Sequence, residues 1–227
     1  MVVTIPDLLD ATQLEALCSV LRQGNFVDGR LSAGSDAEAR KRNLELDSGG
    51  DADRERYDAL NSVVMSSLVR HPDYLLHAMP ARIGAPIYAR YLDGMEYGGH
   101  IDDPLMGAPG ARFRSDISIS IFLNAPREYD GGELTIGSGA EQQSWKLDAG
   151  CALLYPSDSY HAVQPVTRGE RLVAVTWVQS NVRHAAQRRL LVQLAQARDL
   201  ARDIPGSACY EKINLAYANL FRMWAEP

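Results

Sequence analysis

The sequence predicts a mainly β fold with helices at both ends, and three observations support this prediction. From Asp116 to Leu123, isoleucine occupies every second position up to Ile121, and this period of two marks a sheet strand with two different faces. From about Ile83 to Val178, short strand-like runs alternate with Gly, Pro, Asp and Asn, which is typical of a β-sandwich or barrel. Helical periodicity comes before and after this region.

Two helices are expected in the N-terminal part of the chain. Thr12-Gln-Leu-Glu15 has the form of a capping box, and apolar residues then recur at helical spacing as far as Gly24. A second helical stripe ends at His71-Pro72, because the residue before a proline avoids helical backbone angles. Residues 28–51 are rich in Gly, Ser, Asp and Arg, so we expect irregular structure there, with a short strand near Asn43 to Leu46. The two apolar stripes are Leu14, Leu17, Cys18 and Leu21, and then Tyr57, Leu60, Val64 and Leu68.

A series of short strands is expected in the middle of the chain. The candidates are Pro86 to Tyr91, Asp116 to Leu123, Glu133 to Ile136, Trp145 to Leu147, Cys151 to Tyr155 and Arg171 to Val178. Asn124 to Gly132 contains Asn, Pro, Asp and Gly-Gly, so we expect a turn of several residues there. Because turn residues separate the runs at close intervals, we expect them to form one β core.

After Ser180-Asn181 the apolar residues return to helical spacing. The two expected helix faces contain Leu190, Leu191, Leu194 and Ala197, and then Ile213, Tyr217, Leu220 and Trp224. We therefore expect a helical and irregular region at residues 1–80, a β core at 81–180 and a helical extension at 181–227. The helices are expected to brace the core, and the last one packs either on its own core or on a second subunit of a homo-oligomer.

Composition and charge argue against several classes of protein. The formal net charge is −6 without a block of like charge, which gives no reason to expect nucleic acid or an anionic membrane as a partner. No apolar run approaches the roughly 20 residues that cross a bilayer, and the N-terminus lacks the features of a signal peptide. Cys18, Cys151 and Cys209 do not predict a disulfide framework or a zinc site. A reducing, cytoplasmic setting fits these features.

Two histidines and an aspartate form a candidate metal site. His100 and Asp102 lie two residues apart, so in an extended segment both side chains point to one side while Asp103 points away. His161 follows an apolar strand and a turn, a position from which it can point into the mouth of a barrel. Two imidazoles and a carboxylate can bind one face of an octahedral iron and leave three positions open, as in the non-haem Fe(II) oxygenases. Taken alone, the His-x-Asp triplet is explained equally well as a solvated loop pair.

Arg171 begins a strand whose same-face residues are Val173, Val175 and Trp177. An arginine on an apolar face is costly unless it meets an anion. One interpretation is an internal salt bridge to a buried acidic residue. The other is a planar fork that binds a ligand carboxylate through two hydrogen bonds. The presence of the candidate metal residues favours the second interpretation.

These residues match the pattern of a known family. The chain resembles the Fe(II)- and 2-oxoglutarate-dependent dioxygenases of the prolyl 4-hydroxylase superfamily, and within it the bacterial PKHD-type hydroxylases (the PiuC group). The resemblance covers nearly the whole chain. Its motifs are Tyr91-x-x-Gly94-x-x-Tyr97-x-x-His100-x-Asp102, Asp116-Ile-Ser-Ile-Ser-Ile-Phe-Leu-Asn124, Tyr129-Asp-Gly-Gly-Glu-Leu134, Leu154-Tyr-Pro-Ser157, Pro165-Val-Thr-Arg-Gly169 and Trp177-Val-Gln-Ser180.

The resemblance implies a double-stranded β-helix, or jelly-roll, core. It implies an oxidoreductase that hydroxylates a C–H bond while 2-oxoglutarate is converted to succinate and CO2. The residues it assigns are His100, Asp102 and His161 as the Fe(II) ligands and catalytic centre, Arg171 as the partner of the distal carboxylate of 2-oxoglutarate, and Tyr91 and Trp177 as residues of the co-substrate pocket. L-Ascorbate as a further cofactor, and a link to iron or siderophore uptake, also come from the resemblance.

Two other classes of function stay open at this stage. A non-catalytic jelly-roll would bind a metal or a small acid without forming succinate. A zinc hydrolase would use the same residue types with a bound water, but it has no standing need for Arg171. The sequence also leaves the primary substrate open. Asp103 departs from the family pattern, which more often has asparagine at this position, so it weakens any inference of the substrate from the family. Residues 104–114 are either a lid over the substrate or a plain connection.

Overall fold

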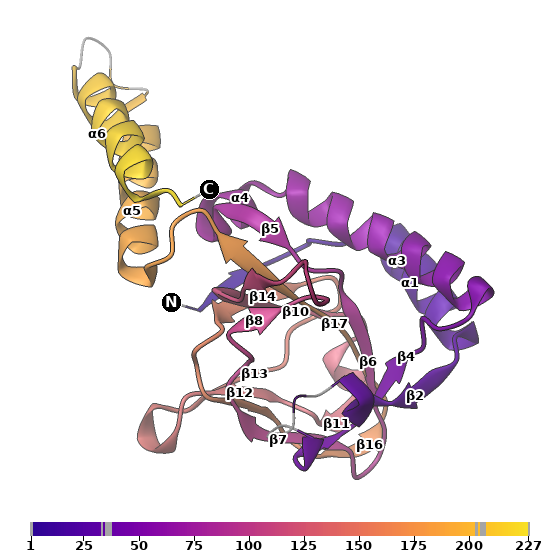
Figure 1. Ribbon diagram of the computed structural model, residues 1–227. Coiled ribbons are helices and arrows are strands. Elements are labelled where there is room, and N and C mark those ends of the chain that lie inside the picture. Colours follow the sequence, from indigo (N-terminus) through magenta and orange to yellow (C-terminus); the bar gives the residue numbers. More distant parts are fainter. Residues whose placement is uncertain (1, 33, 35–37, 203, 205–207, 227) are drawn as a thin grey trace.

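The protein is built around two facing β-sheets, with helices packed on the outer side of the larger sheet (Figure 1). The computed structural model describes residues 2–32, 34, 38–202, 204 and 208–226. All strand pairs among these residues are antiparallel. The mainly β fold with flanking helices that the sequence predicts is therefore confirmed.

The larger sheet contains eight strands. Its order is β1 (Val3–Ile5), β14 (Ala152–Pro156), β10 (Ile117–Phe122), β17 (Arg171–Ser180), β6 (Ile87–Tyr91), β4 (Leu44–Leu46) and β2 (Phe26–Asp28), and β5 (Pro80–Ile83) also pairs with β17. The smaller sheet has five strands in the order β13 (Gln143–Trp145), β12 (Leu134–Ile136), β15 (His161–Val163), β7 (Glu96–His100) and β3 (Lys41–Arg42). Two short ribbons complete the β structure, namely β11 (Tyr129–Gly131) with β16 (Val166–Gly169), and β8 (Leu105–Met106) with β9 (Phe113–Arg114).

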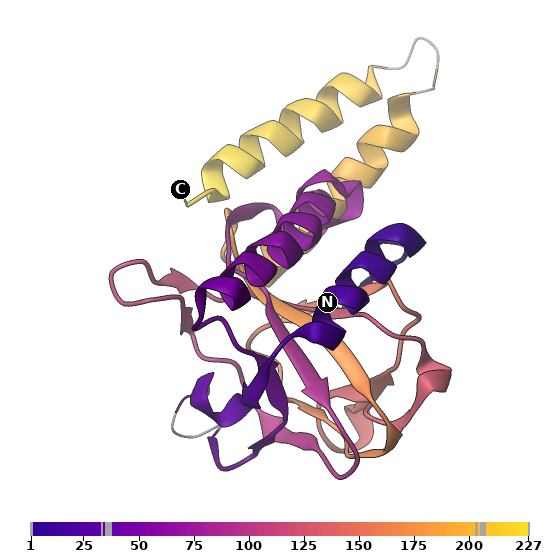
Figure 2. The ribbon, with the colours of Figure 1, turned by 90° about the vertical axis from the view of Figure 1, so that its right-hand side faces the viewer.

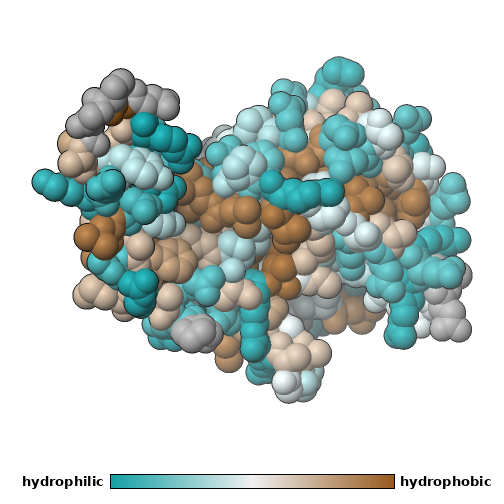
Figure 3. All heavy atoms as spheres, turned by 90° about the horizontal axis from the view of Figure 1, so that it is seen from above, coloured by the Kyte–Doolittle hydropathy of each residue, from teal (hydrophilic) through white to brown (hydrophobic). Residues whose placement is uncertain are grey.

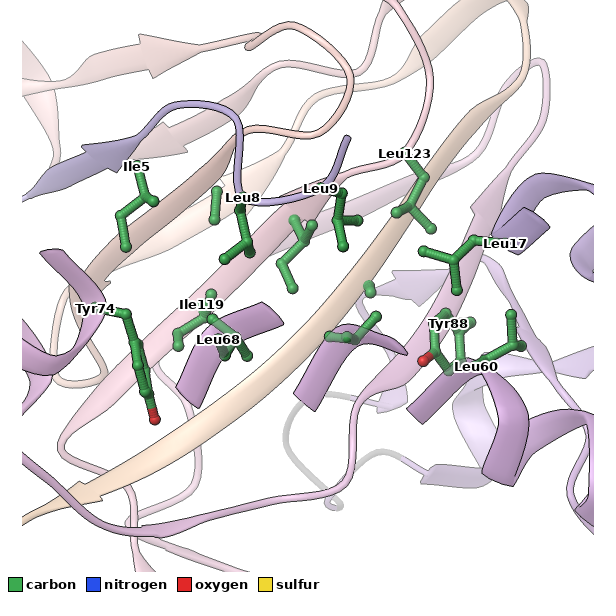
Figure 4. Packing of buried hydrophobic residues seen from close by; sticks show 14 of the residues in the cluster. Ile5, Leu8, Leu9, Leu17, Leu60, Leu68, Tyr74, Tyr88, Ile119 and Leu123 are labelled. Atoms are coloured by element: carbon green, nitrogen blue, oxygen red, sulfur yellow. The ribbon is translucent and has the colours of Figure 1, made fainter. Parts of the chain in front are cut away.

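Strand β10 separates two hydrophobic cores. Ile117, Ile119 and Ile121 pack in the core between the larger sheet and the helices (Figure 4). Phe122 belongs to the second core, which lies between the two sheets. Both faces of β10 are buried, and its serines lie on the face toward the interior of the β core. The period of two in the sequence is thus a true two-faced strand, with an apolar face under the helices and a partly polar face toward the site described below.

The helices are α1 (Ala11–Gln23), α3 (Asp51–Arg70), α4 (Pro72–Ala78), α5 (Ala185–Arg202) and α6 (Cys209–Trp224). The capping box of α1 is formed by Asp10 and Gln13 rather than by Thr12 and Glu15, because Asp10 already satisfies the backbone N–H of Gln13 at 2.8 Å. His71-Pro72 ends α3 as predicted. The same proline then starts α4, which the sequence did not indicate, because proline at the first position of a helix has no N–H to leave unpaired.

The N-terminal region contributes strands as well as helices. The strand expected near Asn43 to Leu46 is present as β4, whereas β3 lies in the stretch that the sequence predicts to be irregular and β2 lies at its start. Each of these strands has only two or three residues, fewer than the roughly four to eight over which alternation identifies a strand. They form because they add to existing sheet edges, with β4 on β6 and β3 on β7. Residues 41–46 therefore touch both sheets.

The C-terminal helices α5 and α6 form a hairpin that projects from the β core (Figures 1 and 2). Of the predicted face of α5, Leu191 is buried but Leu190 is half exposed, and the other buried residues of this helix are Arg188, Val192, Ala195 and Ala201. Arg188 takes a buried place because its guanidinium donates to the carbonyls of Val182 and Arg183, both at 2.7 Å. Seen from above, hydrophobic residues gather near the middle of the helical side of the molecule, and hydrophilic residues surround them (Figure 3). None of the described helices is long and apolar enough to cross a membrane.

The core beneath the helices should dominate the stability of the fold. Leu68 on α3 is fully buried in that core (Figure 4). We expect Leu68→Ala to lower the free energy of unfolding by roughly 2–5 kcal/mol, because it removes buried methyl groups and leaves a cavity. Leu31→Ala is the control, since Leu31 is 81% exposed, and its effect should stay within about 0.5 kcal/mol. Urea unfolding of the two variants measures the difference.

Candidate active site

Two adjacent strands of the smaller sheet bring the two candidate histidines together. His100 ends β7, His161 begins β15, and the two residues are cross-strand partners. Directly opposite residues project from the same face of a sheet, so their rings lie 4.3 Å apart between centroids. Asp102 follows β7, and its Oδ1 atom lies 3.8 Å from the Nε2 atom of each histidine. The ligand atoms of the three residues are all within 4.8 Å of one another, close enough to share one metal ion.

Backbone contacts prepare both imidazoles to bind a metal through Nε2. The Nδ1 atoms of His100 and His161 lie 2.9 Å from the carbonyls of Gly98 and Ser159. A carbonyl only accepts, so each Nδ1 carries a proton, and this tautomer leaves Nε2 of a neutral imidazole free to bind a metal. Burial, and then the neighbouring His161, lower the pKa of His100 to about 4. His100 is therefore neutral at pH 7, as a metal ligand must be.

The carboxylate of Asp102 is held from the opposite side. The hydroxyl of Ser118 on β10 donates to Oδ2 of Asp102, and the hydroxyl of Ser157 lies 2.8 Å from that of Ser118. Oδ2 is thus occupied, and Oδ1 is the oxygen that faces the histidines. Hydrogen bonds of this kind fix the orientation of a metal ligand. The serine face of β10 therefore supports the candidate metal site.

A pH dependence of stability follows from His100. Its pKa is 6.5 in the absence of the fold and about 4 in the folded, metal-free protein. Between these values the unfolded chain binds a proton that the folded chain does not. The free energy of unfolding should therefore be highest above pH 6.5 and decrease progressively as the pH falls toward 4, because protonation of His100 then favours the unfolded chain. Urea unfolding of metal-free protein across this range checks it, and His100→Gln should flatten the profile.

Arg171 is buried in the same interior, and its positive charge has no ion-pair partner among the described residues. It is 1% exposed, and its Nε and Nη1 atoms have no hydrogen-bond partner. No carboxylate among the described residues forms an ion pair with it, so the internal salt bridge considered from the sequence is not found there. The rings of Tyr91 and Phe122 flank its guanidinium, with centroids 5.0 and 5.6 Å away. Gly132 leaves room for it, since a Cβ at that position would lie 3.1 Å from Cδ of Arg171.

One cavity of about 560 Å³ connects these groups. It is lined by all of the site residues predicted from the sequence, namely Tyr91, His100, Asp102, His161, Arg171 and Trp177. Tyr91 is the cross-strand partner of Arg171, and burial raises its pKa to about 12, so it remains a neutral phenol. Trp177 is half-buried, and its Nε1–H has no partner. The cavity thus has a candidate metal-binding corner, formed by His100, Asp102 and His161 beside the smaller sheet, and a guanidinium without an ion-pair partner on the larger sheet.

Comparison with known proteins agrees with this geometry. Residues 86–179 match the family model of the 2OG-Fe(II) oxygenase superfamily. A PKHD-type hydroxylase of Thioalkalivibrio sulfidiphilus is 45% identical over 227 residues, covering all of both chains. Another, from Gloeothece citriformis, is 40% identical over the same length of both chains. The chain belongs to the PKHD-type hydroxylases. It is an oxidoreductase of the Fe(II)- and 2-oxoglutarate-dependent class.

Solved structures with the same fold support the architecture of this hydroxylase. A prolyl hydroxylase from Trichoplax adhaerens, in complex with a hypoxia inducible factor peptide fragment, has a TM-score of 0.54 and 20% identity, covering 84% of this chain and 86% of that one. HygX from Streptomyces hygroscopicus, with nickel, 2-oxoglutarate and hygromycin B bound, has a TM-score of 0.51 and 13% identity, covering 80% and 84%. At these identities the similarity shows the fold alone.

The structure of the hydroxylase adds residues that the sequence analysis did not single out. Ser118 and Ser157 contact the metal-binding corner, and Lys41, Asn43 and Glu45 line the cavity from the N-terminal region. Asn43 and Glu45 lie within the strand expected near Asn43 to Leu46, and Lys41 precedes them at the same period of two, so this pattern could have identified an inward face. Asp103, in contrast, is exposed and is not part of the metal-binding corner.

Proposed function

We propose that this PKHD-type hydroxylase binds Fe(II) through His100, Asp102 and His161 and binds the distal carboxylate of 2-oxoglutarate through Arg171. It would then hydroxylate a C–H bond of a primary substrate while 2-oxoglutarate is converted to succinate and CO2. The observation that carries the proposal is the combination in one cavity of a compact metal-ligand cluster and a buried, unpaired guanidinium. Neither a zinc hydrolase nor a structural metal site needs the guanidinium.

Each residue has a role that follows from its surroundings. Bound Fe(II), with its co-substrate and dioxygen, supplies the oxidising chemistry that no side chain can perform. His100 and His161 offer nitrogen donors through Nε2, and Asp102 offers a carboxylate oxygen in an orientation fixed by Ser118. Arg171 provides a planar pair of donors that match a carboxylate. Trp177 and the other apolar residues of the cavity wall limit the access of water.

We propose that the ribbon formed by β8 and β9 covers the primary substrate, which favours the lid over the plain connection. Leu105, Met106 and Phe113 from this ribbon line the cavity. The turn between the strands contains Gly107 and Gly110, whose φ angles of +99° and +84° suit glycine. A cover of this kind would exclude water from the site during turnover.

An anaerobic titration tests the proposed chemistry. Addition of 2-oxoglutarate to the Fe(II) protein should produce a visible metal-to-ligand charge-transfer band, and admission of air should then release succinate. A band without succinate would favour the non-catalytic binding module. Activity with Zn(II) and no band with Fe(II) would favour the hydrolase. Screening of peptides, protein side chains and siderophore fragments for stimulated succinate release would then address the substrate.

Three further proposals rest on the family resemblance and on composition. We propose L-ascorbate as a reductant that returns oxidised iron to the ferrous state, a cytoplasmic location, and a homo-oligomer formed through the C-terminal helices. Exposed apolar residues on α6, Leu215 and Met223, support the last of these. Recovery of activity with ascorbate after air oxidation tests the first, cell fractionation the second and light scattering the third.

A further inference from the structure

Residues 41–46 connect the two sheets along one side of the cavity. In β3, Lys41 pairs with Tyr97 of β7, which belongs to the smaller sheet. In β4, Glu45 pairs with Ala89 of β6, which belongs to the larger sheet. Asn43 lies between the two strands. The chain therefore crosses from one sheet to the other within a few residues, beside the labelled strands β4, β6 and β7 of Figure 1.

A buried ion pair joins the two ends of this crossing. Lys41 and Glu45 both line the cavity and are 7% and 8% exposed. Nζ of Lys41 lies 2.5 Å from Oε1 of Glu45 and donates to the hydroxyl of Ser32 at 2.8 Å. A buried ion pair rarely stabilises a fold more than two apolar side chains of similar size would. Its presence in the wall of this cavity therefore points to a geometric role.

The two sheets hold opposite ends of the proposed co-substrate site. The metal-binding corner lies on β7 and β15 of the smaller sheet, whereas Arg171 lies on β17 of the larger one. A 2-oxo diacid that binds both the metal ion and Arg171 must therefore match the separation between the two sheets. Lys41 approaches the metal end, because its Nζ lies 5.4 Å from the ring centroid of Tyr97 and that ring stacks on His100 at 3.7 Å. Glu45 approaches the other end, because its cross-strand partner Ala89 is two residues before Tyr91.

We propose that the Lys41–Glu45 ion pair is a positioning device that fixes the distance between the metal-binding corner and Arg171, and so sets the length of 2-oxo diacid that the site accepts. The inference rests on the proposed function of those two groups. In the intact protein, the ion pair holds β3 and β4 at one separation, so a diacid one methylene longer than 2-oxoglutarate fits poorly. Without the pair, the edges of the two sheets move more freely and this discrimination weakens.

The test compares the affinities for 2-oxoglutarate and 2-oxoadipate in the full-length Fe(II) protein. Both dissociation constants are measured without oxygen from the charge-transfer band, for the parent and for the double variant Lys41→Met/Glu45→Leu. We expect the preference for 2-oxoglutarate to fall about tenfold, the size of effect typical of residues behind the direct ligands. A preference equal to that of the parent overturns the inference, even if the variant is less stable, because a purely structural role changes stability alone.

Two control variants retain the ion pair. Lys41→Arg keeps the charge and should keep the parent preference. Arg42→Gln breaks the ion pair between the exposed Arg42 of β3 and Glu96 of β7, and it should also leave the preference for 2-oxoglutarate unchanged. If Arg42→Gln weakens the preference as much as the double variant does, any disturbance of β3 is sufficient and the specific role of the buried pair is wrong.

Two further outcomes are informative. If the double variant does not fold, Glu45→Gln provides the same test, because it removes the charge and keeps the volume; a lowered preference supports the inference and an unchanged one contradicts it. If the parent gives no charge-transfer band with 2-oxoglutarate, the proposed function itself fails and the inference falls with it. A parent that binds 2-oxoglutarate, with a double variant of unchanged preference, rejects the inference alone.

Discussion

Asp102→Ala is expected to abolish Fe(II) binding and 2-oxoglutarate turnover while leaving the sheets and helices folded. Asp102 supplies the only negative charge of the ligand cluster found among the described residues. Its loss should weaken Fe(II) by more than about 100-fold, since loss of an outer-shell partner alone can cost that much. It follows β7 in an irregular segment and is not part of either hydrophobic core, so the secondary structure should be retained.

The matched control is Asp103→Ala. Asp103 is the neighbouring carboxylate, but it is exposed and lies near Gly34 rather than near the histidines. This variant should bind Fe(II) like the parent. Metal content after dialysis, circular dichroism and succinate release measure the three properties separately. Equal Fe(II) affinity in Asp102→Ala and the parent would remove the basis of the proposed metal site, and loss of binding in Asp103→Ala would show that the wrong aspartate was chosen.

The elements that the sequence predicted correctly are those whose pattern lies within a single segment of the chain. The alternating isoleucines of β10, the run of β17 and the stop at Pro72 depend on local periodicity or local backbone chemistry. Strand β7 was not predicted, because Glu96-Tyr-Gly-Gly-His100 has little β propensity. It becomes a strand only by pairing with β15 on one side and β3 on the other.

The same distinction applies to the site. His100, Asp102, His161 and Arg171 could be selected because polar and charged side chains seldom point into a β core unless they bind a partner there. That His100 and His161 are cross-strand partners depends on the register of two distant segments, which no local pattern specifies. The ion pair of Lys41 was missed for a different reason, because charged residues in a polar stretch are usually solvated. The ion pair is buried only because β3 and β4 pair with the edges of the two sheets.

Removal of the Arg171 guanidinium should weaken 2-oxoglutarate strongly without loss of iron. Two charge-assisted hydrogen bonds contribute roughly 1.5–3 kcal/mol each, so their loss should raise the dissociation constant for 2-oxoglutarate by at least about 100-fold. Arg171→Ala tests the loss of the whole side chain. Arg171→Met keeps most of its volume, and Arg171→Lys keeps the charge but not the planar fork, so Lys should recover only part of the affinity.

The free energy of unfolding provides an independent test of the role of Arg171. A side chain retained for folding would destabilise the protein when replaced, but Nε and Nη1 of Arg171 are buried without partners. Replacing an uncompensated buried charge by an apolar side chain should leave the free energy of unfolding unchanged or raise it. Arg171→Met is therefore expected to unfold at the same or higher urea concentration as the parent while binding 2-oxoglutarate far more weakly. Parent-like affinity for 2-oxoglutarate in Arg171→Met would mean that another group holds the distal carboxylate, and marked destabilisation would mean that Arg171 serves the fold.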